Sequence, residues 1–318
     1  MNWQLFPQFF ATGILNGGPI ALIALGIVLV YKSSEVFNFA HGQMLLVGAM
    51  TTWWFSSADF GLGWHWAPAV LAALLVSILL GLAIERLALR PLTGQSLLSI
   101  ILMTLAISQV LQGLIVLVFG ATQRNFPVIF PVDQPYKIQL PITYGGNALV
   151  IILRQNLVWS FITAMLAVIL LWAFFQYTRM GLAMRATAEN HETAQSVGIR
   201  IRSIFGLSWA IAGIIATLGG VLIATASGLD LSLPIVVLAA FPAVLLGGLE
   251  SIPGAVLGGL IVGLSKEIVA LPNDRFFLGP DIAQLIRNAK DIVPYLILLL
   301  VLFIRPDGLF GQRRIERV

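Results

Sequence analysis

Long apolar runs recur along almost the whole chain, and they constrain its fold more than any other feature. Hydrophobic residues make up 58% of the 318 residues and charged residues only 10%, whereas a soluble domain has roughly 25% charged residues. We therefore predict one all-α transmembrane domain over residues 1–318. Since several runs are shorter than the roughly 20 residues of a straight crossing, we expect about eight to ten spans, some broken or re-entrant. The candidate spans are Phe9–Val30, Val36–Phe55, Trp66–Leu87, Leu97–Phe119, Leu157–Phe175, Ile204–Ala226, Ile235–Gly247, Gly254–Ala270 and Ile292–Ile304.

Basic side chains collect in three of the segments between these runs, which accounts for the net charge of +4 without nucleic-acid binding. Because Lys and Arg concentrate in cytoplasmic loops, we place all three segments and the C-terminus in the cytoplasm, and the N-terminus outside. This leaves an external loop over about residues 120–155 and a cytoplasmic loop over about 178–203. The basic residues are Arg86 and Arg90; Arg179, Arg185, Arg200 and Arg202; and Arg305, Arg313, Arg314 and Arg317.

The external loop is rich in residues that break helices. Its prolines exclude a long regular helix, and long loops in compact proteins usually have a function. We therefore favour a structured docking segment over an irregular connector. The breakers are Pro127, Pro131, Pro135, Pro141, Gly145 and Gly146.

The second run opens with three hydrogen-bonding side chains, Asn38, His41 and Gln43. Polar groups are costly in lipid unless they face the protein interior or water. Asn38 and His41 are three residues apart and would share a helix face. We predict that the three line a polar substrate path. The alternative is that they hydrogen-bond neighbouring helices and fix their packing.

Glycines at four-residue spacing predict helices that pack closely, because the missing side chains let two backbones approach. This pattern concerns packing and says nothing about the solute. The pairs are Gly13 and Gly17, Gly254 and Gly258, and Gly259 and Gly263.

Three features are missing from the sequence. No Asp, Glu, Lys or Arg lies deep within a long run, no GxxxxGK[ST] phosphate loop is present, and there is no cysteine. We expect no cofactor and no metal site in this chain, and no enzymatic activity, because nucleophile, base and ligand clusters are also missing. A chain that moves solute without its own coupling charge is driven by another subunit or is a passive pore. An autonomous secondary carrier and an intramembrane enzyme are the remaining alternatives.

The loop between the fifth and sixth runs carries a candidate docking helix. Thr187 can cap its start, Glu189 favours its dipole, and Gly198 can close it. We predict one exposed helix over Thr187–Gly198, about 15 Å long, which could lie in a groove of a partner. The alternative is a solvated connector. Glu192, Ala194 and Gly198 follow the order E-x-A-x-x-x-G.

Four stretches, in this order, resemble the H-type permease subunits of branched-chain amino-acid ABC importers. They are Phe37–Gly42 with Gly48 and Ala49, Arg179–Gly198, Leu246–Gly254 and Arg305–Gly311. Urea and short-amide permeases resemble the same pattern. The E-x-A-x-x-x-G order is similar to the EAA loop by which importer permeases touch their ATPases, although no Ile-Leu-Pro follows Gly198.

The resemblance implies a multi-pass subunit of a bacterial-type inner membrane. Its partners would be a second, M-type permease, two cytoplasmic ATPases that hold ATP and Mg, and a substrate-binding protein outside the membrane. Because the binding protein would select the solute, this chain does not reveal which amino acid is carried. The residues expected to couple to the ATPase are Thr187, Glu189, Glu192, Ala194 and Gly198.

Overall fold

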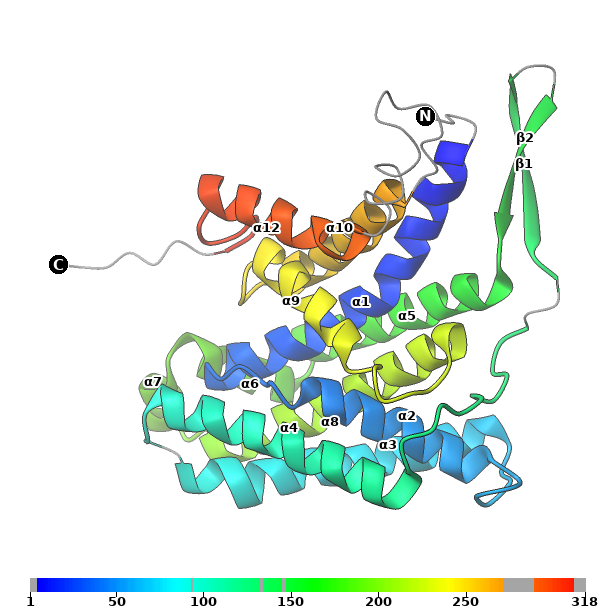
Figure 1. Cartoon of the computed structure of the whole chain (residues 1–318). Coiled ribbons are helices and arrows are strands. Elements are labelled where there is room, and N and C mark those ends of the chain that lie inside the picture. The colour runs from blue at the N-terminus through cyan, green and yellow to red at the C-terminus, as the bar shows by residue number, and fades with distance from the viewer. Residues whose placement is uncertain (1–4, 93, 132–133, 145–146, 271–288, 312–318) are drawn as a thin grey trace.

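The computed structural model describes residues 5–92, 94–131, 134–144, 147–270 and 289–311, and it is a bundle of helices with one β-hairpin (Figure 1). The predicted all-α membrane fold is confirmed, and each of the nine apolar runs forms a helix. These helices are α1 (Phe6–Ser34), α2 (His41–Ser56), α3 (Trp66–Ala83), α4 (Leu97–Phe119), α5 (Gln155–Tyr177), α8 (Ile201–Ser227), α9 (Ile235–Gly247), α10 (Ile252–Val269) and α12 (Val293–Ile304).

Shorter elements join the spans. A π-helical turn η2 (Ile84–Leu89) and a 3₁₀ turn η3 (Arg90–Leu92) follow α3, and η4 (Ala289–Asp291) precedes α12. Between α5 and α8 lie α6 (Arg179–Glu189) and α7 (His191–Ser196). Within the described residues, six helices are long and apolar enough to cross a membrane. The helices α2, α9 and α12 are shorter, with 16, 13 and 12 residues.

The bundle has a buried centre and an exposed apolar periphery. Within their most apolar windows, α1 and α8 are each 83% buried, whereas α3, α4 and α5 are only 17–28% buried. Since those outer helices are as apolar as the inner ones, their exposed side chains are suited to contact with lipid. The centre therefore consists of α1 and α8, with α2, α9 and α10 packed around them.

The most extensive contact between two helices joins α1 to α10. A side chain added at Gly17 would lie 2.8 Å from the Cα of Leu260, and one at Gly263 would meet the backbone of Gly17. Further along the same contact, Gly259 faces the backbone of Ala21. The predicted close packing at the glycine pairs is thus confirmed, and a larger residue at Gly263 would force the helices apart.

The predicted external loop contains a β-hairpin that the sequence analysis did not foresee. Strand β1 (Tyr136–Tyr144) pairs antiparallel with β2 (Asn147–Leu153), with a register shift between Gln139 and Thr143. The Gln8 side chain donates to the Ile152 carbonyl and accepts from the Ile152 amide, both at 2.6 Å. The amide thus acts like a strand backbone and ties the hairpin to the start of α1. Gly145 and Gly146 lie outside the described residues.

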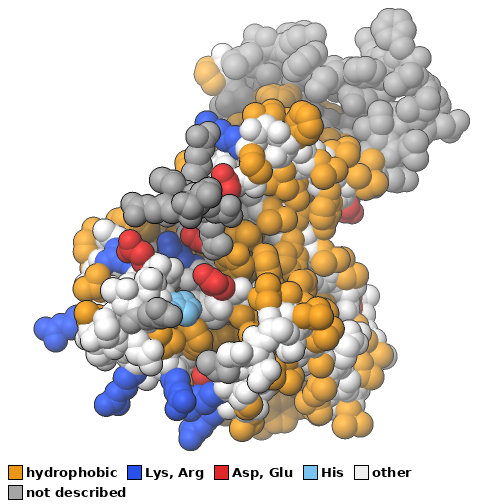
Figure 2. All heavy atoms as spheres, turned by 90° about the vertical axis from the view of Figure 1, so that its left-hand side faces the viewer, with side chains coloured by type: hydrophobic (Ala, Val, Ile, Leu, Met, Phe, Trp, Pro, Cys, Tyr) orange, Lys and Arg blue, Asp and Glu red, His pale blue; other side chains and the backbone are white. Residues whose placement is uncertain are grey.

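The two ends of the bundle differ in charge. We call the end that carries the α3–α4 connection, α6, α7 and the segment after α12 the basic end, and the opposite end the hairpin end. Figure 2 views the basic end and shows Lys and Arg side chains gathered in the lower left of this face. Its exposed arginines are Arg86, Arg179, Arg200, Arg202 and Arg305, while Arg313, Arg314 and Arg317 lie outside the described residues.

Candidate coupling surface and substrate path

The chain reverses sharply between α5 and α6. The Thr178 hydroxyl donates to the Phe174 carbonyl at 2.7 Å and accepts from the Gly181 amide at 3.0 Å, which caps the start of α6. A side chain at Gly181 would collide with the carbonyls of Phe174 and Phe175. The hydroxyl and the glycine together fix the angle at which α6 leaves the membrane span.

The predicted single helix over Thr187–Gly198 is wrong, because two helices meet at Asn190. The Asn190 side chain accepts from the Thr193 amide at 2.8 Å and so caps α7. Thr187 is not a cap: it lies inside α6, fully buried, and its hydroxyl donates to the Ala183 carbonyl at 2.9 Å. Glu189 accordingly ends α6 and does not lie in a first turn. Gly198 has a φ of +88°, the left-handed conformation that is common in a glycine that follows a helix.

Buried side chains hold this pair of helices against the bundle. Met184 of α6 belongs to the same buried cluster as Leu29 of α1 and Ile204 of α8. The His191 ring contacts the Thr187 carbonyl through Nδ1 at 2.5 Å and packs edge-on against Phe205 of α8. A displacement of α6 and α7 would therefore be passed directly to the two central helices.

The other face of the pair is open. Glu189, Val197 and Arg200 are exposed. Val197, which directly follows α7 outside the membrane-spanning helices, is 72% exposed. Ala194 points the other way and is buried. The backbone of Glu192 lies in α7, but its side chain lies outside the described residues. This outer face is therefore accessible to a protein partner.

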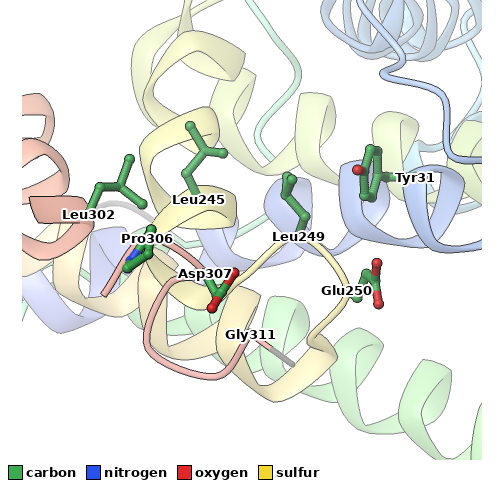
Figure 3. Close-up of a pocket in the computed structure, with 8 residues that line it drawn as sticks. All are labelled: Tyr31, Leu245, Leu249, Glu250, Leu302, Pro306, Asp307 and Gly311. Atoms are coloured by element: carbon green, nitrogen blue, oxygen red, sulfur yellow. The ribbon is translucent and has the colours of Figure 1, made fainter. Parts of the chain in front are cut away.

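The segment after α12 returns to the link between α9 and α10. The Leu309 amide donates to the Leu246 carbonyl at 2.8 Å, and the Phe310 amide donates to the Gly247 carbonyl at 3.2 Å. Two of the stretches that carry the family resemblance are thus hydrogen-bonded to each other. Between them lies a cavity of about 230 Å³ (Figure 3), whose lining residues are Tyr31, Leu245, Leu249, Glu250, Leu302, Pro306, Asp307 and Gly311.

The predicted path residues lie at the centre of the bundle, but not all on one helix. Asn38 precedes α2, which begins at His41, so the expectation that the two share a helix face is wrong. Asn38 and His41 are fully buried and Gln43 is 7% exposed. The His41 ring packs against Gly26 of α1. Their role in a path stays a prediction, since other residues line the cavities of about 230–290 Å³ in the described part of the chain.

These side chains also lack the hydrogen bonds that the packing alternative requires. Among the described residues, no partner is found for Asn38 Oδ1, for either ring nitrogen of His41, or for Gln43 Oε1. Asn38 Nδ2 has only a weak contact with the Met44 sulfur, at 3.6 Å. Buried polar atoms without partners destabilise a fold, so their presence favours a functional role over packing.

One buried acid at the basic end escaped the sequence analysis. Glu85 is 5% exposed and lies 3.4 Å from Arg90. Both line a cavity of about 250 Å³ together with Glu35 and His191, so this cavity adjoins the start of α7. Glu85 lies near the end of the apolar run Trp66–Leu87, beside Arg86. Nothing in the sequence indicated its burial, because the π-helical turn that buries it leaves no clear periodicity.

Comparison with known proteins places the chain in a family. The family model described as "Branched-chain amino acid transport system / permease component" matches residues 9–302. The chain belongs to this family. It is 30% identical to the high-affinity branched-chain amino acid transport system permease protein LivH of Salmonella typhimurium, over 98% of both chains. It is also 30% identical to BraD of Pseudomonas aeruginosa, a permease of the same description, over 98% of this chain and 97% of that one.

More distant permeases have other solutes in their names. The galactofuranose transporter permease protein YtfT of Escherichia coli is 25% identical over 92% of this chain and 78% of that one. In this chain, three of the four stretches that carry the resemblance lie at the basic end of the bundle: Arg179–Gly198, Leu246–Gly254 and Arg305–Gly311. The resemblance therefore concerns that end more than any solute site.

Proposed function

We propose that this chain is the permease subunit of an ABC importer that takes up branched-chain amino acids. The observation that carries the proposal is the helix pair α6–α7, which is anchored to both central helices and exposes its other face at the basic end. Membership of the permease family and 30% identity to LivH and BraD support it. The sequence has no phosphate loop, so the energy for transport is supplied by another subunit.

The partners follow from this division of labour. Two ATPases, which bind ATP and Mg, drive transport from the cytoplasm, one of them docked on α6–α7 of this chain, and a second, M-type permease completes the membrane path. A substrate-binding protein delivers the amino acid at the hairpin end, outside the membrane. This orientation rests on the basic residues of the opposite end, since Lys and Arg favour the cytoplasmic side. The coupling residues on the ATPase side include Glu189, Glu192 and Gly198.

Reconstituted transport tests the proposal. The chain is purified with a second permease, the ATPases and the binding protein of its own transport system, and the complex is placed in vesicles. We expect ATP-dependent uptake of labelled leucine, isoleucine or valine, and none without ATP or without the ATPases. Uptake of urea in preference to these amino acids would contradict the substrate, and uptake by this chain alone under an ion gradient would contradict the ABC mechanism.

A further inference from the structure

A cavity at the hairpin end has the chemistry of a small-molecule site. Its volume is about 290 Å³, close to the roughly 300 Å³ at which ligand pockets begin. Helices α1, α5, α8, α9 and α10 contribute to its wall. We call it the outer cavity; its lining residues are Leu15, Asn16, Pro19, Ile20, Leu157, Ser160, Leu222, Ile223, Ala226, Ser227, Val236, Gly263, Lys266, Glu267 and Lys290.

Charged side chains of both signs line it, two lysines and one carboxylate. Asn16 Nδ2 donates to Glu267 Oε1 at 2.8 Å, which orients this carboxylate, and Lys266 forms an ion pair with Asp291 at 2.7 Å. In the part of the chain that the structure describes, Lys290 at the rim has no carboxylate within ion-pair distance. Asp291, which is not part of the lining, pairs with Lys266. Glu267 and Lys290 therefore leave one charge of each sign for a ligand, so the site favours a ligand that is neutral overall but carries both charges.

Two uncharged polar groups in the same wall lack their usual hydrogen-bond partners. Ser160 is 2% exposed, and its hydroxyl has no hydrogen-bond partner among the described residues. Pro19 has no N–H, so the carbonyl of Leu15, four residues earlier, lacks its usual helical donor. Ser160 and Leu15 both line the outer cavity. A buried hydroxyl without a partner is the signal expected of a group that bonds to a transient ligand.

The remaining wall is aliphatic. The side chains of Ile20, Leu222, Ile223 and Val236 line it, and no aromatic ring does so among the described residues. An aliphatic wall buries a branched hydrocarbon side chain favourably. Sugars, by contrast, are usually held by aromatic rings against their C–H faces. No cluster of metal-binding side chains is found in the described ranges.

An adjoining cavity provides the entry. It measures about 260 Å³ and shares Asn16, Leu157 and Glu267 with the outer cavity. Its other wall includes Ile152 of the hairpin and Arg154. A solute released beside the hairpin would therefore reach Glu267 first from this side.

We propose that the outer cavity is a binding station for a free, zwitterionic aliphatic amino acid, with Glu267 receiving the ammonium group, Lys290 receiving the carboxylate, and Ser160 bonding to the bound molecule. This proposal rests on the proposed function, since it names the residues of this chain that hold the solute between the binding protein and the deeper path. Glu267 and Lys290 select both charges, while the aliphatic wall selects the side chain.

Protection of a single thiol tests the station directly. Because the chain has no cysteine, Ser160→Cys introduces the only thiol of this subunit. The variant is assembled with its partner subunits in membranes, and the rate of its modification by a small thiol reagent is followed by mass spectrometry of this chain. We expect leucine to slow the reaction saturably. Leucinamide, which lacks the carboxylate, and 4-methylpentanoate, which lacks the ammonium, should need about tenfold higher concentrations, because each loses one charge-assisted contact.

Two matched variants make the result specific. Ala58→Cys lies exposed on the α2–α3 connection, at the same end of the bundle, and leucine should not protect it. Glu267→Gln in the Ser160→Cys background keeps an oxygen that accepts from Asn16 but removes the charge. It should weaken protection by leucine about tenfold and leave protection by 4-methylpentanoate unchanged.

The outcomes separate this proposal from the function on which it rests. If all three compounds protect equally, if leucine protects Ala58→Cys as well, or if leucine gives no protection while the native complex transports it, the outer cavity is not the station and the proposed function stands. If the native complex transports no amino acid, both proposals fail together.

Discussion

The basic end and the hairpin end of the bundle both carry charged side chains, but they arrange them in different ways. At the basic end, arginines such as Arg179 and Arg200 are exposed around a helix pair whose inner face is fixed by Met184 and Thr187. At the hairpin end, charges of both signs line a cavity, and Glu267 is held there by Asn16. Charged side chains that are exposed on a firmly packed helix pair suit contact with a large partner. Charged side chains that line a small cavity suit a small solute.

Thiol labelling tests most directly which end faces the cytoplasm, because each position either reacts or does not. Asn125→Cys at the hairpin end and Asn190→Cys at the basic end are both exposed positions. In intact cells, we expect an impermeant thiol reagent to modify position 125 and to spare position 190. After the membranes are opened, both should react. Modification of position 190 in intact cells would reverse the two ends and with them the assignment of partners.

A substitution at Gly198 should produce the largest functional effect at the basic end. A β-branched residue is strained at a φ of +88°, by roughly 1–2 kcal/mol, so Gly198→Val should displace α7. We expect ATPase co-purification to fall about tenfold and uptake to be lost, with membrane abundance unchanged. Glu192→Lys should have the same effect by reversing a charge on α7.

Two control variants separate coupling from simple backbone strain. Gly120 also has a positive φ, +80°, at the hairpin end of α4, where the nearest atom to an added Cβ is Arg124 Nη2 at 4.0 Å, so Gly120→Val imposes similar strain far from α7. Gly198→Asn should retain function, because Asn tolerates the left-handed conformation. Normal transport and ATPase binding in Gly198→Val would show that the segment is only a connector.

A smaller effect is expected at the centre, between the two ends. Replacing Asn38 and His41 together by leucine removes buried polar atoms that have no partner among the described residues, so stability should not fall by more than about 1 kcal/mol. Uptake should nevertheless fall severalfold, because the polar path would be interrupted. Abundance in the membrane and uptake are measured on the same samples. A parallel loss of both would identify these residues as packing residues.

Helix positions could be predicted because hydrophobicity and helix ends are local properties. The helices Leu97–Phe119 and Ile235–Gly247 have the bounds that the apolar runs predicted. The first is capped by the Ser96 side chain and followed by Gly120 with a positive φ. Such signals lie within a few residues of the helix they end.

The details that failed depend on contacts between distant segments. Thr187, Thr178 and Asn190 are all capable of capping a helix, and burial of Thr187 against the bundle decides that the latter two do so. Lys266 and Glu267 lie near the end of the apolar run Gly254–Ala270. Their place in the outer cavity depends on the approach of α10 to α1 and α5, which no local pattern reveals.

The glycine contact between α1 and α10 has a consequence for biogenesis. Gly17 is made near the start of synthesis and its neighbour Gly263 near the end, so at about 5–20 residues per second α1 waits for tens of seconds before its partner exists. During that interval the glycine face of α1 has only lipid, the insertion machinery or other nascent helices to contact. In a nascent chain halted before α10, the glycine face of α1 therefore lacks its packing partner. Quality-control proteases in the membrane would distinguish such a chain from the completed subunit by this exposed face.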